Sequence, residues 1–177
     1  MFKDFKPVLF ILGRFLAIYL IPVLLYQFYL NQYSGQGLDP ISHWVARQSV
    51  AIQEFLGYTS QLVDGKPEHE TSWFRIEDRW VSRMVEGCNA ISVMILFAAF
   101  IFAFYKGAKT YLFVGFGIVL LHLMNISRIA GLNIVIFEKP EYGKVAHDYF
   151  FPAIIYGTVV LLWIIWIKFF ALKDENS

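Results

Sequence analysis

Apolar runs long enough to cross a lipid bilayer constrain this sequence more than any other feature. They cover about residues 7–30, 89–105, 111–128 and 152–171. A helix needs about 20 apolar residues to span the hydrocarbon core. Composition agrees, because 58% of the residues are hydrophobic and 16% are charged, whereas soluble domains average roughly 45–50% and about 25%. The chain is therefore predicted to be a polytopic membrane protein.

The same runs predict an all-α architecture, a four-span helical bundle. With 177 residues the chain has the length of about one domain, so residues 1–177 are assigned to a single integral membrane domain. No small-residue cleavage site follows the first run, so we expect that run to stay in the membrane and not to be removed as a signal peptide. The formal net charge of +1 gives no basic excess for nucleic-acid binding.

Four spans place both termini on one side, and the basic residues beside the spans predict that this side is the cytoplasm. These residues are Lys3, Lys6, Lys106, Lys109, Lys168 and Lys173. The outer face then carries a long loop of residues 31–87 and a shorter one of about residues 128–147. The lipid bilayer itself is thus the first partner that the sequence predicts.

The long outer loop is expected to contain an amphipathic helix. Asp39 followed by Pro40 is typical of an N-cap and a first helical residue. Apolar residues then recur at helical spacing until Gly57, which ends the pattern. Such a helix can lie on the membrane, cap the bundle as a lid, or bind substrate. Further along, Arg75, Arg79 and Arg83 have a four-residue spacing that predicts one solvated face of a second helix.

Three residues in or beside the spans carry chemistry that lipid-facing positions do not need: Cys88, Arg128 and His147. Cys88 begins the second run, Arg128 ends the third and His147 precedes the fourth. Because successive spans alternate in direction, all three are predicted to lie at the same membrane face. Arg128 is the least ordinary of them, since apolar residues continue beyond it and a cation in such a setting is a functional candidate.

The three residue types together suit acyl-transfer chemistry. A cysteine attacks as its thiolate, which a helix N-terminus and a nearby cation both favour. A histidine can take the thiol proton and return it to a leaving amine. An arginine can stabilise an oxyanion or bind a substrate carboxylate, and the sequence leaves both roles open for Arg128. Each residue alone also has a structural interpretation: a small apolar filler for Cys88, and headgroup contacts for Arg128 and His147.

The neighbourhoods of these residues resemble those of the exosortase and archaeosortase family of membrane-embedded cysteine transpeptidases, in particular the compact exosortase F type. The matching stretches are Glu86–Ser92 (EGCNAIS), Asn125–Ile129 (NISRI) and Ala146–Asp148 (AHD). The resemblance is close over about residues 83–156 and general elsewhere. Many family members have a small residue and a glycine after the cysteine, where this chain has Asn89 and Ala90.

The resemblance implies a catalytic triad of Cys88 as nucleophile, His147 as acid and base, and Arg128 as transition-state or substrate stabiliser. It implies cleavage of exported proteins at a C-terminal sorting signal, which consists of a short motif, a transmembrane helix and a basic tail. It places the enzyme in a bacterial cytoplasmic membrane with the site facing outward. The cleaved protein would pass to an acceptor such as a cell-surface lipid or glycan.

Supporting roles are predicted for a few neighbours. Asn125 shares the helix face of Arg128 and can orient a substrate carbonyl or form an interhelical hydrogen bond. Asp148 can pair with His147 or Arg128, or only favour the helix N-terminus. Glu86 can act as an acid near the thiol or as a solvated cap. We expect no cofactor and no metal: there is one cysteine, and no ligand spacing or H-E-x-x-H pattern occurs.

Two other functional classes compete with the enzyme. A non-enzymatic small subunit or scaffold of an envelope assembly would need only the packing faces of the helices. A transporter or channel would need polar residues deep within several spans, and the second and fourth runs have almost none there. The scaffold is therefore the stronger alternative.

Overall fold

The computed structural model describes residues 6–171, and most of them are helical. The elements in chain order are α1 (Lys6–Asn31), α2 (Pro40–Phe55), β1 (Ser60–Asp64), η1 (Pro67–His69), β2 (Thr71–Ile76), β3 (Arg79–Val85), α3 (Ile91–Ala103) and α4 (Ala108–Glu138). They are followed by η2 (Pro140–Tyr142), α5 (Gly143–Val145), η3 (Ala146–Phe150), α6 (Phe151–Trp166) and η4 (Ile167–Ala171). Lys3 and Lys173, two of the cations used to predict orientation, lie outside the described residues.

Three helical stretches are long and apolar enough to cross a membrane: Val8–Asn31, Ala108–Glu138 and Pro140–Ala171. The fourth predicted span is a shorter apolar helix, α3, of 13 residues. At 1.5 Å per residue α3 is about 20 Å long, less than the ~30 Å hydrocarbon core. The structure thus supports a helical membrane protein with three long apolar helices and one short one.

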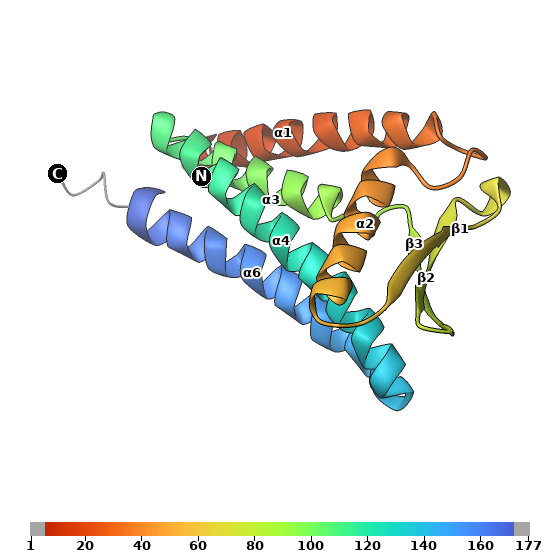
Figure 1. Ribbon diagram of the computed structural model, residues 1–177. Coiled ribbons are helices and arrows are strands. Elements are labelled where there is room, and N and C mark those ends of the chain that lie inside the picture. Colours follow the sequence, from red (N-terminus) through yellow and green to blue (C-terminus); the bar gives the residue numbers. More distant parts are fainter. Residues whose placement is uncertain (1–5, 172–177) are drawn as a thin grey trace.

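The helices are close at one end, and α1 diverges from α4 and α6 toward the other end, where α2 and the β-sheet lie (Figure 1). The start of α1, the turn between α3 and α4, and the end of α6 are at the opposite end. A cation–π contact agrees with this arrangement, since the Arg14 guanidinium carbon lies 5.7 Å from the Tyr105 ring centroid in that turn. Arg14, the charged residue within the first apolar run, therefore contacts an aromatic ring.

The predicted helix after Asp39 is present as α2. The Asp39 side chain accepts hydrogen bonds from the backbone N–H groups of Ile41 and Ser42, and Pro40 is in the first turn. The buried face of α2 contributes Val45 and Ala46 to a core with Phe74 and Met84 of the sheet. Ile126 and Ile129 of α4 complete this core, so α2 packs between the sheet and α4.

The all-α prediction is wrong for residues 60–85, which form an antiparallel sheet of order β1-β2-β3. The predicted arginine-striped helix does not form, because Arg75 belongs to β2 and Arg79 and Arg83 to β3. In β2 buried and more exposed residues alternate from Ser72 to Ile76, a period of two that suits a half-buried strand. A tight turn joins β2 to β3, with Ile76 opposite Arg79, so the three arginines are distributed over a hairpin and not along one face of a helix.

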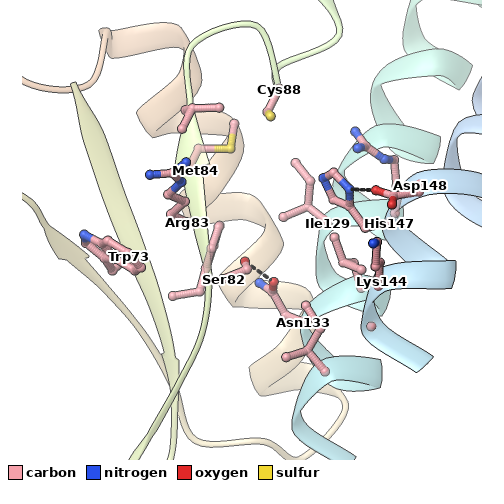
Figure 2. Close-up of a pocket in the computed structure, with 16 residues that line it drawn as sticks. Trp73, Ser82, Arg83, Met84, Cys88, Ile129, Asn133, Lys144, His147 and Asp148 are labelled. Carbon is pink, nitrogen blue, oxygen red and sulfur yellow. Dashed lines mark hydrogen bonds and ion pairs between the residues drawn. The ribbon is translucent and has the colours of Figure 1, made fainter. Parts of the chain in front are cut away.

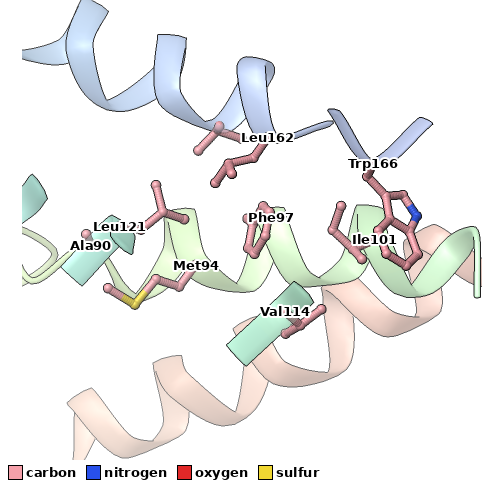
Figure 3. Packing of buried hydrophobic residues seen from close by; sticks show 9 residues of the cluster. Ala90, Met94, Phe97, Ile101, Val114, Leu121, Leu162 and Trp166 are labelled. Carbon is pink, nitrogen blue, oxygen red and sulfur yellow. The ribbon is translucent and has the colours of Figure 1, made fainter. Parts of the chain in front are cut away.

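The largest apolar core lies between α3, α4 and α6 (Figure 3). Phe97 and Ile101 of α3 are fully buried, as is Trp166 of α6. Figure 3 shows Phe97 between α3 and Leu162. Gly117 of α4 makes room for this ring, since a Cβ atom there would lie 2.2 Å from Phe97 Cζ. The core holds α3, α4 and α6 together and includes Ala90, two residues after Cys88.

Candidate functional site

A cavity of about 610 Å³ lies between β3, α4 and the helical segment that precedes α6 (Figure 2). Cys88, Arg128 and His147 all line it. The structure therefore brings the three residues singled out in the sequence to one cavity. Five residues of α4 form one helical stripe along its wall: Arg128, Ile129, Leu132, Asn133 and Ile136.

Cys88 lies in the turn that joins β3 to α3. Its N–H donates to the Val85 carbonyl at 3.2 Å. Gly87 and Ala90 on either side have positive φ angles of 81° and 63°. Glycine adopts this left-handed conformation freely, whereas alanine does so at a cost. The prediction that Cys88 begins a helix is wrong by three residues, since α3 starts at Ile91, and the dipole effect falls off within a turn.

Asn89 holds this turn in place and was not predicted to do so. Its side chain is 1% exposed. The Nδ2 atom donates to the Tyr26 hydroxyl at 2.6 Å and to Ser42 Oγ at 2.8 Å, and Oδ1 accepts from the Ile91 N–H at 3.0 Å. One side chain thus ties α1, α2 and α3 together beside the thiol. The sequence signal for this role is the position of Asn89 next to Cys88, just before an apolar run.

Asn125 connects Cys88 to Arg128. Its Nδ2 donates to the Cys88 carbonyl oxygen at 2.9 Å, and its Oδ1 accepts from Arg128 Nη1 at 3.3 Å. The predicted interhelical role of Asn125 is therefore present, with the backbone of Cys88 as acceptor. Arg128 Nε is buried without a hydrogen-bond partner, so the guanidinium keeps a donor that no described residue uses.

The sequence predicted that Arg128 ends its helix. In the structure α4 continues beyond it to Glu138. The residues after Arg128 remain apolar, and Ile129, Leu132 and Phe137 are buried. These side chains pack against other parts of the chain, and this packing stabilises the turns of α4 beyond Arg128. Arg128 consequently projects from the middle of α4's C-terminal half and lines the cavity from the side.

His147 lies in the π-helical turn η3, on the opposite side of the cavity from Arg83 and Met84 (Figure 2). Its Nδ1 is 2.8 Å from Asp148 Oδ1. The two side chains are 60% and 40% exposed. His147 and Arg128 were the predicted partners of Asp148, and in the structure its hydrogen-bond partner is His147. With Nδ1 occupied, Nε2 is the ring nitrogen left for proton transfer.

Cys88 and Arg128 also line a second, smaller cavity of about 190 Å³. Its other walls include Val93 of α3 and Pro152 and Tyr156 of α6. This cavity lies between the first turns of two apolar helices, whereas the larger one lies against the sheet. The thiol is thus at the junction between a smaller space lined by α3, α4 and α6 and a larger space that lies against the sheet.

Positive charge dominates the ionic lining of the larger cavity. Arg83, Arg128 and Lys144 line it, against Asp148 as the one carboxylate. Arg83 and Lys144 were not predicted as site residues. Asn133 was also missed; it lies eight residues after Asn125 on the same face of α4, and its Oδ1 accepts from Ser82 Oγ of β3. A polar residue recurring on one face of an apolar helix is the signal that could have found it.

The remaining polar candidates lie elsewhere. Glu86 is not in either cavity lining described above, and burial raises the pKa of its carboxyl, with Glu70 and Asp39 adding to the effect. His122 binds Gln48 at 2.8 Å, and His43 binds Asp64 at 3.2 Å. Within residues 6–171 no group of three His, Cys, Asp or Glu side chains is arranged to hold a metal ion.

Comparison of the chain with protein-family models, with curated proteins and with solved structures finds no match in any of the three. Function therefore has to be inferred from the site itself.

Proposed function

We propose that this protein is a membrane-embedded cysteine peptidase or transpeptidase of the exosortase type. It cleaves the C-terminal sorting signals of exported proteins at the outer face of a bacterial cytoplasmic membrane. The observation that carries the proposal is that Cys88, Arg128 and His147 line one cavity. A scaffold protein has no need to gather a thiol, a guanidinium and an imidazole around an open space.

The residues have distinct roles in the proposed reaction. His147 takes the proton of the Cys88 thiol. The thiolate attacks the carbonyl carbon of the scissile peptide bond, and Arg128 offsets the negative charge that develops on the carbonyl oxygen. The C–N bond breaks as His147 gives its proton to the leaving amine, which leaves a thioester on Cys88. Water or an acceptor amine or hydroxyl then gives a proton to His147 as it attacks the thioester. The C–S bond breaks, and Cys88 takes the proton from His147 and is again a thiol. Asp148 holds the His147 ring through Nδ1.

The membrane arrangement in this proposal has four crossings, of which α3 is the short one. The small cavity between α3 and α6 opens beside Cys88, where the transmembrane helix of a substrate can approach from the bilayer. The substrate's motif then reaches the thiol from the membrane side, and the exported part of the protein extends over the sheet. α2 and the sheet would face outward with the site.

The direct test is to replace Cys88 by alanine in the native cell. We expect exported proteins with a C-terminal apolar helix and basic tail to accumulate in the membrane with that tail intact. Ser92→Ala, an exposed position in the first turn of α3, is the matched control and should leave processing normal. If Cys88→Ala is silent while Phe97→Ala in the core disturbs the envelope, the chain is a structural subunit and the enzymatic proposal fails.

A second test asks whether the thiol is coupled to its neighbours. A membrane-impermeant maleimide should label Cys88, the single cysteine, from the outer side. Labelling at neutral pH should slow in Arg128→Ala and in His147→Ala. If Cys88 is labelled only after the inner face is exposed, the proposed orientation is wrong. If the parent, Arg128→Ala and His147→Ala are labelled at equal rates, the thiol is not coupled to these two residues.

A further inference from the structure

The edge of β3 that does not pair with β2 faces the larger cavity. Four consecutive residues of the strand, Ser82–Val85, line that cavity. Side chains in a strand alternate between the two faces of the sheet. Trp73 and Phe74 of β2 also line the cavity, so the space passes around the free edge of β3 and reaches both faces of the sheet. β2 occupies the other edge, and no strand of residues 6–171 pairs with the edge beside the cavity.

The hydrogen-bond pattern shows which backbone groups this edge presents. The Thr71 carbonyl accepts from the Gly65 N–H at 2.9 Å, so the backbone groups of Thr71 point toward β1. Successive residues of an antiparallel strand point in opposite directions. Ser72 and Phe74 therefore point toward β3, where they are opposite Met84 and Ser82.

Met84 and Ser82 accordingly use their backbone groups for the sheet, and the residues between and after them point the other way. These are Arg83 and Val85. The Val85 carbonyl is taken by the Cys88 N–H. The N–H and C=O of Arg83 and the N–H of Val85 are then directed at the cavity. They repeat at the two-residue spacing that an added strand needs.

We infer that an extended segment of a polypeptide substrate, carrying an acidic side chain, binds as an added strand along this edge of β3. The inference rests on the proposed function and defines how that site holds its substrate. The strand ends at Val85, three residues before Cys88, so a peptide paired with Arg83 leads directly to the thiol. The three cations that line the cavity against one carboxylate select an acidic segment over a basic one.

The test uses the single cysteine as its own reporter, in the full chain in membranes. The probe is the peptide acetyl-Ala-Asp-Ala-Ala chloromethyl ketone, which alkylates a thiol with loss of chloride. Variants of the probe carry one N-methyl group at each amide in turn, and one variant has Lys in place of Asp. Mass spectrometry measures labelling of Cys88, with iodoacetamide as the reference for bare thiol reactivity.

Strand addition predicts a period of two. Methylation of the amides that pair with β3 should slow labelling at least about fivefold, the size of one or two hydrogen bonds, and methylation of the alternate amides should have little effect. The Asp probe should react faster than the Lys probe. Uniform sensitivity to methylation, or equal reactivity of the Asp and Lys probes, would overturn the inference.

Variants of the strand give an independent check. Arg83→Pro removes the N–H that points into the cavity, at an edge position where proline leaves the sheet's own hydrogen bonds intact. It should abolish the alternating pattern, whereas Arg83→Ala keeps the N–H and should keep the pattern. Iodoacetamide rates that match the parent show that both variants are folded. If Arg83→Pro does not fold, the methylation series on the parent chain still tests whether the peptide binds as an added strand.

The outcome is separable from that of the proposed function. If Cys88→Ala leaves exported proteins unchanged in cells but the alternating pattern is present, the sorting activity is wrong and the strand-binding edge stands. If processing depends on Cys88 but labelling shows no alternation, the sorting activity stands and the strand-binding inference is wrong. A Cys88 thiol that reacts with no reagent, iodoacetamide included, contradicts both.

Discussion

Asn125 donates a hydrogen bond to the carbonyl oxygen of Cys88, at 2.9 Å, across the interface between α4 and the β3–α3 turn. The same side chain accepts from Arg128, so the backbone of the candidate nucleophile and the guanidinium share one positioning residue. Asn125 is 1% exposed. Loss of a buried polar partner costs about 1–3 kcal/mol when the other groups are left unsatisfied.

We therefore expect Asn125→Ala to lower the stability of the protein by about 1–3 kcal/mol and to change the labelling rate of Cys88 at fixed pH. Thermal unfolding in detergent and maleimide labelling measure the two effects. Ser127→Ala, at an exposed position of the same helix, is the matched control. Unaltered labelling in Asn125→Ala would mean that the hydrogen bond does not position the thiol.

The His147–Asp148 pair gives a prediction about proton transfer. His147→Ala should reduce processing of sorting signals by about 10²–10⁴-fold, the usual contribution of a general acid–base group. Asp148→Asn keeps the shape of the side chain but loses its charge, so it should cause a smaller loss and alter the pH–rate profile. Glu141→Gln, an exposed carboxylate in η2, should have no effect. Full activity of His147→Ala would exclude the proposed role.

Asn89 is predicted to be the most sensitive polar residue beside the site. It makes three hydrogen bonds, to Tyr26, Ser42 and the Ile91 N–H. Asn89→Ala should lower stability by about 2–4 kcal/mol, since each lost bond contributes about 1 kcal/mol and buried partners are left unpaired. The comparison is with Asn31→Ala, whose side chain accepts one exposed hydrogen bond from Gln27. Similar melting temperatures for the two variants would contradict the prediction.

The contact between α3 and α4 depends on a glycine. A Cβ atom at Gly117 would lie 2.2 Å from Cζ and 2.3 Å from Cε1 of Phe97, and Phe97 is fully buried. Gly117→Ala should therefore destabilise the protein by about 1–3 kcal/mol through overpacking. Gly115→Ala on the same helix has nothing within 4 Å and should be neutral or slightly stabilising. Thermal unfolding of the pair in one detergent tests the difference, and equal effects would show that α3 and α4 adjust freely.

Glu86 gives a prediction about pH. Burial, together with the charges of Glu70 and Asp39, raises the pKa of its carboxyl above the ordinary value of 4.5, and its Oε1 is buried with no hydrogen-bond partner among residues 6–171. Because the folded chain holds this proton more tightly than the unfolded chain, the stabilisation is full below the ordinary pKa. It is lost as the pH rises through the raised value.

Glu86→Gln should consequently melt at a higher temperature than the parent near neutral pH. The difference should shrink as the pH falls and disappear well below the ordinary pKa of 4.5, where the parent carboxyl is protonated in both states. Glu54→Gln, at an exposed position of α2, should show no such trend. A constant difference between Glu86→Gln and the parent at every pH would place the effect in packing and not in ionisation.

Prediction from the sequence was most successful where the signal is local. The long apolar helices and the α2 cap at Asp39 were predicted because hydrophobic length and capping chemistry are properties of a few neighbouring residues. The ends of the helices were less well predicted: α4 continues past Arg128 to Glu138 and α3 begins after Cys88. Helix ends depend on what the next turn packs against, which a single segment does not reveal.

The sequence by itself determined that this chain is a helical membrane protein and that Cys88, Arg128 and His147 belong near one end of its helices, since span length and chain direction are fixed by the order of residues. Only the tertiary structure decided that residues 60–85 form a sheet, that Asn125 and Asn89 hold the Cys88 turn, and that the edge of β3 faces the cavity. Strand pairing and buried hydrogen bonds join residues far apart in the chain, such as Asn89 with Tyr26 and Ser82 with Asn133. Their geometry exists only once the helices have packed.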